Sequence, residues 1–111
     1  KCNFFIISVP TPIKKNFKPD LSYLKKASVS IAKVIKKDDI AVFESTVYPG
    51  VTEDFCVPII EKNSGLDLNK DFYIGYSPER VNPGDKTNTL NNITKIVAIK
   101  TKNKKIFRIW I

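Results

Sequence analysis

The chain has 111 residues, of which 42% are hydrophobic, and 19 basic against 11 acidic side chains give it a formal net charge of +8. This length and composition fit one small domain or part of a larger one, and they exclude wholesale disorder. The longest uncharged stretch, residues 2–13, is too short for a transmembrane helix, which needs about 20 residues. Because histidine is absent, histidine-based acid–base catalysis is excluded and a zinc site is nearly so.

The first half of the chain predicts a strand, a loop and a helix. An uninterrupted apolar run at residues 3–9 is typical of a strand that is buried on both faces of a parallel sheet, and two prolines end it. Residues 13–19 form a polar, lysine-rich loop. Asp20 is a suitable N-cap for a helix over residues 21–36, where apolar side chains recur at helical spacing.

The same alternation continues after this helix. Residues 39–44 predict a second strand, followed by a polar turn at 45–50. A second helix begins near Thr52, and Pro58 within it predicts a kink or a helix in two parts. Gly65 is expected to end that helix.

Two further strands complete the predicted elements, at residues 71–77 and 94–99, with a long irregular stretch between them. Strands that alternate with helices indicate an α/β fold with a mostly parallel sheet and right-handed crossovers. None of the four glycines belongs to a GxGxxG loop, so the pattern alone indicates half of a nucleotide-binding α/β domain.

Three of the predicted turns begin at the carboxyl ends of strands, where open parallel sheets bind their ligands. They read VPTP, ESTVYPG and YSPERVNPG, and we expect all three to project into one crevice. The first two offer hydroxyl and amide groups that suit ribose and phosphate oxygens. The third offers the Glu79 carboxylate and the Arg80 guanidinium, which could grip a phosphate.

Each turn also has a purely structural explanation, which the pattern leaves open. The Pro-Thr-Pro segment around Thr11 would serve as a rigid loop, and Ser45 and Thr46 would bond nearby backbone groups. Glu79 and Arg80 would form a surface ion pair of little energy.

The two cysteines, Cys2 and Cys56, belong to no CxxC motif, and we expect reduced thiols rather than a disulfide. Cys56 lies in a helical apolar stripe, so buried packing is favoured over a nucleophilic role. Cys2, at the start of a strand, is no better a candidate for a nucleophile than Cys56 is.

The three motifs stand in register with one another. ISVPTP followed by KPDL, then VFESTVYPGVTED, then YIGYSPERVNPGD resemble the UDP-glucose/GDP-mannose dehydrogenase family over about residues 2–97. They are most similar to its branch acting on UDP-N-acetylhexosamines, in which SPERVNPG replaces SPEFLREG. The resemblance implies a cytoplasmic NAD-dependent enzyme that oxidises the sugar C6 alcohol to a carboxylate in two steps.

The resemblance also implies roles for individual residues. Thr11 and Thr46 match positions that contact NAD, and Glu79 matches an active-site glutamate that handles water or protons during thioester hydrolysis. Arg80 and Val81 match positions that touch the UDP-sugar. The implied partner is a UDP-N-acetylhexosamine, with no nucleic acid and no membrane, and the full-length relatives are expected to be homo-oligomers.

The chain departs from the family at both ends. The GxGYVG unit would precede Lys1, and the catalytic cysteine and second domain would follow Ile111. We therefore expect residues 1–99 to be a partial, Rossmann-like (doubly wound) NAD-binding domain lacking its first GxGxxG βαβ unit, and residues 100–111 to be a divergent basic and apolar tail. Such a fragment is expected to be inactive alone.

Two alternatives remain open. One is a non-functional truncated gene product. The other is a small basic module that binds nucleic acid or acidic lipid, because residues 100–111 carry five basic and no acidic side chains, with Phe107 and Trp110 for stacking. AT-rich codons explain the many Lys, Ile and Asn residues without any such partner. Nucleic-acid modules also tend to interleave arginine with aromatic residues, and only two arginines occur here.

Overall fold

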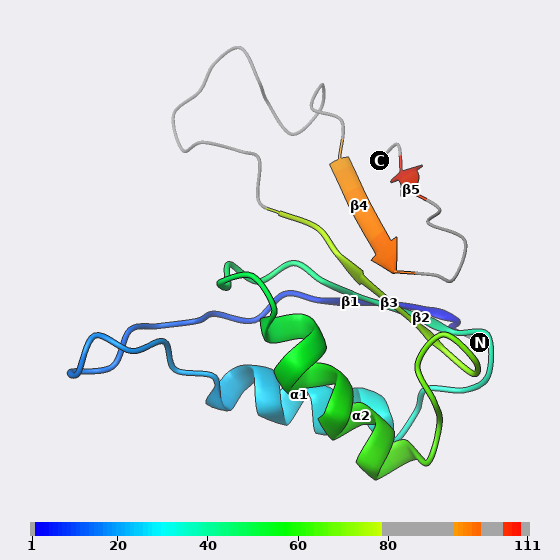
Figure 1. Ribbon diagram of the computed structural model, residues 1–111, viewed down its shortest axis with the longest axis horizontal. Coiled ribbons are helices and arrows are strands. Elements are labelled where there is room, and N and C mark those ends of the chain that lie inside the picture. The colour runs from blue at the N-terminus through cyan, green and yellow to red at the C-terminus, as the bar shows by residue number, and fades with distance from the viewer. Residues whose placement is uncertain (1, 79–94, 101–105, 110–111) are drawn as a thin grey trace.

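The computed structural model describes residues 2–78, 95–100 and 106–109. Within them a five-stranded sheet with the strand order β1-β2-β3-β4-β5 carries both helices on one face (Figure 1). The elements are β1 (Phe4–Ile7), α1 (Ser22–Ala32), β2 (Ile40–Phe43), the π-helix η1 (Thr52–Cys56), α2 (Val57–Ser64), β3 (Tyr73–Tyr76), β4 (Lys95–Lys100) and β5 (Ile106–Ile109). The predicted order of strands and helices is confirmed as far as β4, and β5 is an additional strand that the sequence does not predict.

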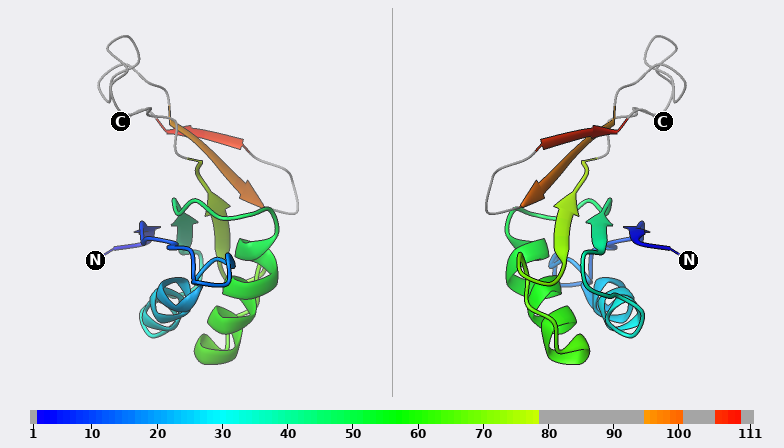
Figure 2. Two further views of the ribbon diagram at one scale, coloured as in Figure 1. Left: turned by 90° about the vertical axis from the view of Figure 1, so that its left-hand side faces the viewer. Right: turned by 90° about the vertical axis from the view of Figure 1, so that its right-hand side faces the viewer.

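Strands β1, β2 and β3 are parallel and end together. Ile7 pairs with Phe43, and Phe43 with Tyr76, so the turns that follow the three strands start at one edge of the sheet. Strands β4 and β5 extend the sheet in antiparallel fashion, away from the helices (Figure 2). The α/β fold with a partial Rossmann-like, mostly parallel sheet is confirmed.

The prediction that the first strand is buried on both faces is wrong. Ile7 faces the helices and is buried, whereas Ile6 points to the other face and is 54% exposed. Within the described residues β1 is the edge strand of the sheet. The side chains of an edge strand receive neighbours from one flank only, so an apolar run does not by itself indicate two-sided burial.

The first helix is shorter at both ends than its apolar spacing predicts. Leu21 occupies the N-cap position, and Asp20 instead accepts a hydrogen bond from the Ser22 amide at 3.0 Å, which lowers the pKa of the Asp20 carboxyl. At the far end the Asp39 carboxylate accepts a hydrogen bond from the Lys36 amide at 2.8 Å. That local turn competes with the last helical turn, so the regular helix ends at Ala32.

The predicted two-part helix is confirmed, and its parts join just before Pro58. A π-helical turn, Thr52–Cys56, continues with helical backbone angles into α2, where Pro58 lies in the first turn. Gly65 ends α2 in the left-handed conformation, at a φ of 73°, and its amide donates to the Glu61 carbonyl.

The larger hydrophobic core lies between the sheet and the helices. It joins the inner side chains of the parallel strands, such as Ala41 and Phe43, to Leu24 of α1 and Ile60 of α2. A smaller cluster on the opposite face contains Val42, Val97 and Ile99. Neither helix of the described residues is long and apolar enough to cross a bilayer.

The basic tail expected at residues 100–111 lies partly outside the described residues, as do Phe107's side chain and Trp110. The part that is described is β5, whose backbone pairs with β4 from Lys95↔Ile109 to Ala98↔Ile106. The boundary between a family domain at 1–99 and a divergent tail stays a prediction.

Candidate functional site

The turns that follow β1 and β2 are fastened to each other by one buried side chain. The Ser45 hydroxyl, 4% exposed, accepts a hydrogen bond from the Val9 amide at 3.1 Å and donates one to the Val9 carbonyl at 2.6 Å. Each bond links positions 36 residues apart in the sequence. The explanation of Ser45 as a purely local turn residue is therefore wrong, because its partner lies in the neighbouring turn.

A second contact joins the two threonines that the sequence singles out. The Thr11 hydroxyl donates to the Thr46 carbonyl, with 2.5 Å between the oxygen atoms. Thr46 is exposed and Thr11 is half-buried, so both can be reached from solvent. Among the described residues, the amides of Thr46 and Val47 donate no hydrogen bond.

The third turn starts at the same edge of the sheet. The Ser77 amide donates to the Phe43 carbonyl at 2.9 Å, which holds the end of β3 beside the end of β2. Glu79, Arg80 and Val81 lie outside the described residues. The expected crevice is thus described for two of its three turns, and the meeting of Glu79 with the two threonines stays a prediction.

Two cavities lie next to this edge, between η1 and the sheet. One of about 300 Å³ is lined by the turn from Val47 to Gly50, by Thr52 and Glu53 of η1, and by Tyr76 at the end of β3. Neither Thr11 nor Thr46 lines it. Its polar groups come from η1 and from Tyr48 and Tyr76, which the sequence does not single out.

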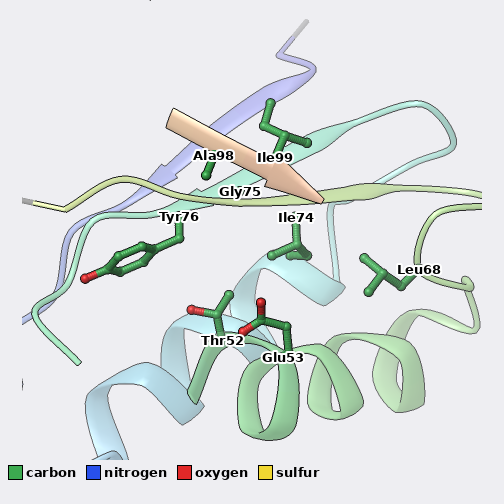
Figure 3. Close-up of a pocket in the computed structure, with 8 residues that line it drawn as sticks. All are labelled: Thr52, Glu53, Leu68, Ile74, Gly75, Tyr76, Ala98 and Ile99. Atoms are coloured by element: carbon green, nitrogen blue, oxygen red, sulfur yellow. The ribbon is translucent and has the colours of Figure 1, made fainter. Parts of the chain in front are cut away.

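The second cavity, of about 360 Å³, runs under β3 and shares three residues with the first, Thr52, Glu53 and Tyr76. Figure 3 shows a Glu53 oxygen pointing from η1 toward Ile74 of β3, whereas the Thr52 oxygen points sideways, toward the side of the cavity where Tyr76 lies. This cavity is mainly apolar, and its side-chain oxygen groups come from Thr52 and Glu53 of η1 and from Tyr76 of β3.

The cysteines are placed as the sequence predicts. Both are free, with Cys2 exposed and Cys56 1% exposed within the core. Burial raises the pKa of the Cys56 thiol, which keeps it protonated and unsuited to act as a nucleophile at neutral pH.

Sequence reasoning treats Ser45 as part of a motif and misses its structural role. One signal could have indicated that role. Ser45 follows a buried strand whose last residue pairs with the last residue of β1, so its inward side chain must meet the turn after β1.

The family model for the NAD binding domain of the UDP-glucose/GDP-mannose dehydrogenase family matches residues 1–110. The chain is 58% identical over 101 residues to a UDP-N-acetyl-D-glucosamine 6-dehydrogenase from Pseudomonas aeruginosa, covering 91% of this chain and 24% of the relative. It is 60% identical, with the same coverage, to Protein CapL from Staphylococcus aureus. The chain therefore spans about a quarter of the length of the curated relatives it matches.

Among solved structures, a UDP-D-ManNAc dehydrogenase from Pyrococcus horikoshii superposes with a TM-score of 0.78 at 36% identity. A ternary complex of GDP-mannose dehydrogenase from Pseudomonas aeruginosa superposes with a TM-score of 0.76 at 27% identity. In each case 92% of this chain and 24% of the other chain are covered.

Proposed function

The chain belongs to the UDP-glucose/GDP-mannose dehydrogenase family, and on that premise we propose that it is part of the NAD-binding domain of a cytoplasmic UDP-N-acetylhexosamine 6-dehydrogenase. Such an enzyme oxidises the C6 alcohol of the sugar to a uronate. The observation that carries the proposal is the contact between Thr11 and Thr46 at the common end of β1 and β2.

The groups at this edge fit the cofactor. NAD presents ribose hydroxyls and phosphate oxygens; the Thr46 and Val47 amides and the Thr46 hydroxyl are donors of the matching kind, and the Thr11 hydroxyl, which donates to Thr46, can accept from a ribose hydroxyl. When bound, NAD supplies the hydride-accepting chemistry that no side chain can provide. Thr11 and Thr46 would orient it, and the Ser45 bonds to Val9 would hold the two turns at a fixed separation.

The remaining roles fall on residues of the third turn. We propose that Glu79 positions water or moves a proton during thioester hydrolysis, and that Arg80 and Val81 contact the UDP-sugar. The turn they belong to leaves β3 beside Phe43, at the edge that also carries Thr46. A turn that begins at this edge is compatible with a Glu79 carboxylate placed near the cofactor.

The isolated chain is expected to give no turnover. Its 111 residues contain no GxGxxG loop, and neither cysteine suits the nucleophile, since Cys56 is buried and Cys2 precedes β1. Covalent catalysis of the aldehyde step needs an activated thiol. Incubation of the chain with NAD and UDP-N-acetylglucosamine should therefore produce no NADH absorbance, and appreciable NADH would contradict this part of the proposal.

Binding tests the cofactor site separately from turnover. In ¹H–¹⁵N NMR titrations with NAD, we expect weak binding, on the order of 1 mM, with the largest shifts at the amides of Thr11, Thr46 and Val47. Thr11→Val should weaken these shifts. Ser30→Ala on the exposed side of α1 is the control and should leave them unchanged. Shifts confined to other elements, or none at several millimolar NAD, would refute the assignment.

A further inference from the structure

The loop at residues 13–19, between β1 and α1, displays apolar side chains at an outlying end of the molecule. Figure 1 shows this part of the chain extending well beyond the sheet and the helices. Ile13 is 72% exposed and Phe17 is 91% exposed, the highest exposure among the large hydrophobic residues of the described chain. A phenylalanine in this position contributes almost nothing to the core.

The 13–19 loop is an ordered turn closed by its own backbone. The Lys14 amide donates to the Lys18 carbonyl, and the Phe17 amide donates to the Lys14 carbonyl, both at 2.9 Å. Ile13 and Pro19 form an antiparallel bridge at its base. The closed turn therefore holds its side chains in a fixed outward arrangement.

Phe17 adopts a backbone conformation that does not favour it. Its φ of 61° lies in the left-handed region, which glycine and asparagine occupy far more readily than an aromatic residue. The fold thus keeps a bulky apolar side chain at the tip of the turn although a smaller residue would suit the backbone better. Phe17 therefore has no evident role in packing or in backbone geometry.

Positive charge surrounds this apolar tip. Lys14, Lys15 and Lys18 are all exposed. The one ion pair that the described residues form here joins Lys14 to Asp20, over 3.7 Å at the base of the loop. An exposed aromatic ring flanked by lysines matches the interface of an anionic bilayer, where the ring enters the headgroup region and the ammonium groups meet lipid phosphates.

We propose that the 13–19 loop is a docking element for the surface of a membrane that contains anionic lipids. The resemblance implies no membrane partner, so this proposal departs from that expectation; attachment to a membrane surface needs no spanning segment. The proposal does not depend on the dehydrogenase assignment. Nucleic acid fits the loop less well, because the loop holds no arginine and one ring cannot form a stacking platform.

Vesicle sedimentation with the 111-residue chain tests the proposal. We expect binding to vesicles of phosphatidylcholine and phosphatidylserine in a 7:3 ratio, and at least tenfold weaker binding to pure phosphatidylcholine. The triple variant K14Q/K15Q/K18Q should lose about a hundredfold, since each lysine near an anionic surface accounts for roughly fivefold. The matched control K33Q/K36Q/K37Q removes the same charge at the far end of α1 and should lose much less.

The aromatic residue is tested by Phe17→Asn, which suits a positive φ and should preserve the circular dichroism spectrum and melting temperature while weakening vesicle binding about tenfold. Phe17→Gly is a second variant with the same expectation. Absence of binding to anionic vesicles, or equal losses in the two lysine triples, would overturn the proposal. So would unchanged binding by both Phe17 variants, or loop-dependent binding to a DNA oligonucleotide without vesicle binding.

Discussion

The two faces of the sheet differ in how they are covered. On one face α1, η1 and α2 enclose the inner side chains of β1, β2 and β3, and Phe43 is fully buried there. On the other face, described residues bury only a small cluster beneath β4, and Ile6 remains half exposed. Strand sequences on the two faces are equally apolar, so hydrophobicity alone does not reveal which face is packed.

The difference indicates where stability and function reside. Dense packing under the helices holds the parallel strands in register, and that register sets the positions of the turns that carry Thr11 and Thr46. The opposite face adds less buried surface. Substitutions that act on the two faces should therefore have different effects on unfolding, and four predictions follow in decreasing order of expected effect.

Truncation of the helix-covered core should have the largest effect. Phe43→Ala removes a fully buried ring and should lower the free energy of unfolding by about 3–5 kcal/mol, measured by urea denaturation. Ile6→Ala on the opposite face is the comparison, and its cost should stay below about 1 kcal/mol. Equal losses for both variants would mean that the two faces are packed alike.

Gly75 tests a point where the opposite face is tightly packed. A methyl group added there would lie 3.1 Å from Ile99 Cγ1 and 3.2 Å from both Val42 Cγ2 and Val97 Cγ1. Gly75→Ala should therefore cost about 1–3 kcal/mol of unfolding free energy. Val42→Ala creates room, so the double variant should lose less than the sum of the single losses, whereas strict additivity would refute the contact.

The two hydrogen bonds between Ser45 and Val9, here called the Ser45–Val9 bridge, lie just beyond the ends of β1 and β2. Ser45→Ala leaves the Val9 amide and carbonyl without their partner and should cost about 1–2 kcal/mol in denaturant unfolding. It should also speed hydrogen exchange at the Val9 amide. Ser30→Ala, which removes an exposed hydroxyl bonded to the Lys26 carbonyl, is the control and should change neither quantity appreciably.

The smallest effect concerns Cys56 at high pH. Burial raises its thiol pKa above the ordinary value of 9.0, so above that pH the unfolded chain loses the proton while the folded chain retains it. The free energy of unfolding should therefore fall as pH rises beyond about 9. Cys56→Ala should reduce this fall and Cys2→Ser should not. Identical slopes in both variants would show that the thiol is not shielded.

Much of the fold could be predicted because local chemistry and packing agree. Pro58 and Gly65 mark the change from π-helix to α-helix and the end of α2, and both act through backbone geometry that a sequence displays directly. The end of α1 could not be predicted in this way. It depends on the Asp39 carboxylate reaching the Lys36 amide, a local competition that apolar spacing does not register.

In the candidate site, too, some features could be predicted from the sequence and others could not. The meeting of Thr11 and Thr46 follows from parallel strands of matched register, which the alternating pattern indicates. The two cavities, by contrast, are lined by Thr52 and Glu53 of the π-helical turn. Residue spacing read as an α-helix gives no sign of that extra residue per turn.

The Ser45–Val9 bridge also constrains how this scaffold can be changed. Two segments 36 residues apart share one hydroxyl, so neither is an independent module for loop grafting. Because the bridge uses the backbone amide and carbonyl of Val9, it tolerates any residue except proline at position 9. Position 45, in contrast, needs a side chain that both donates and accepts a hydrogen bond.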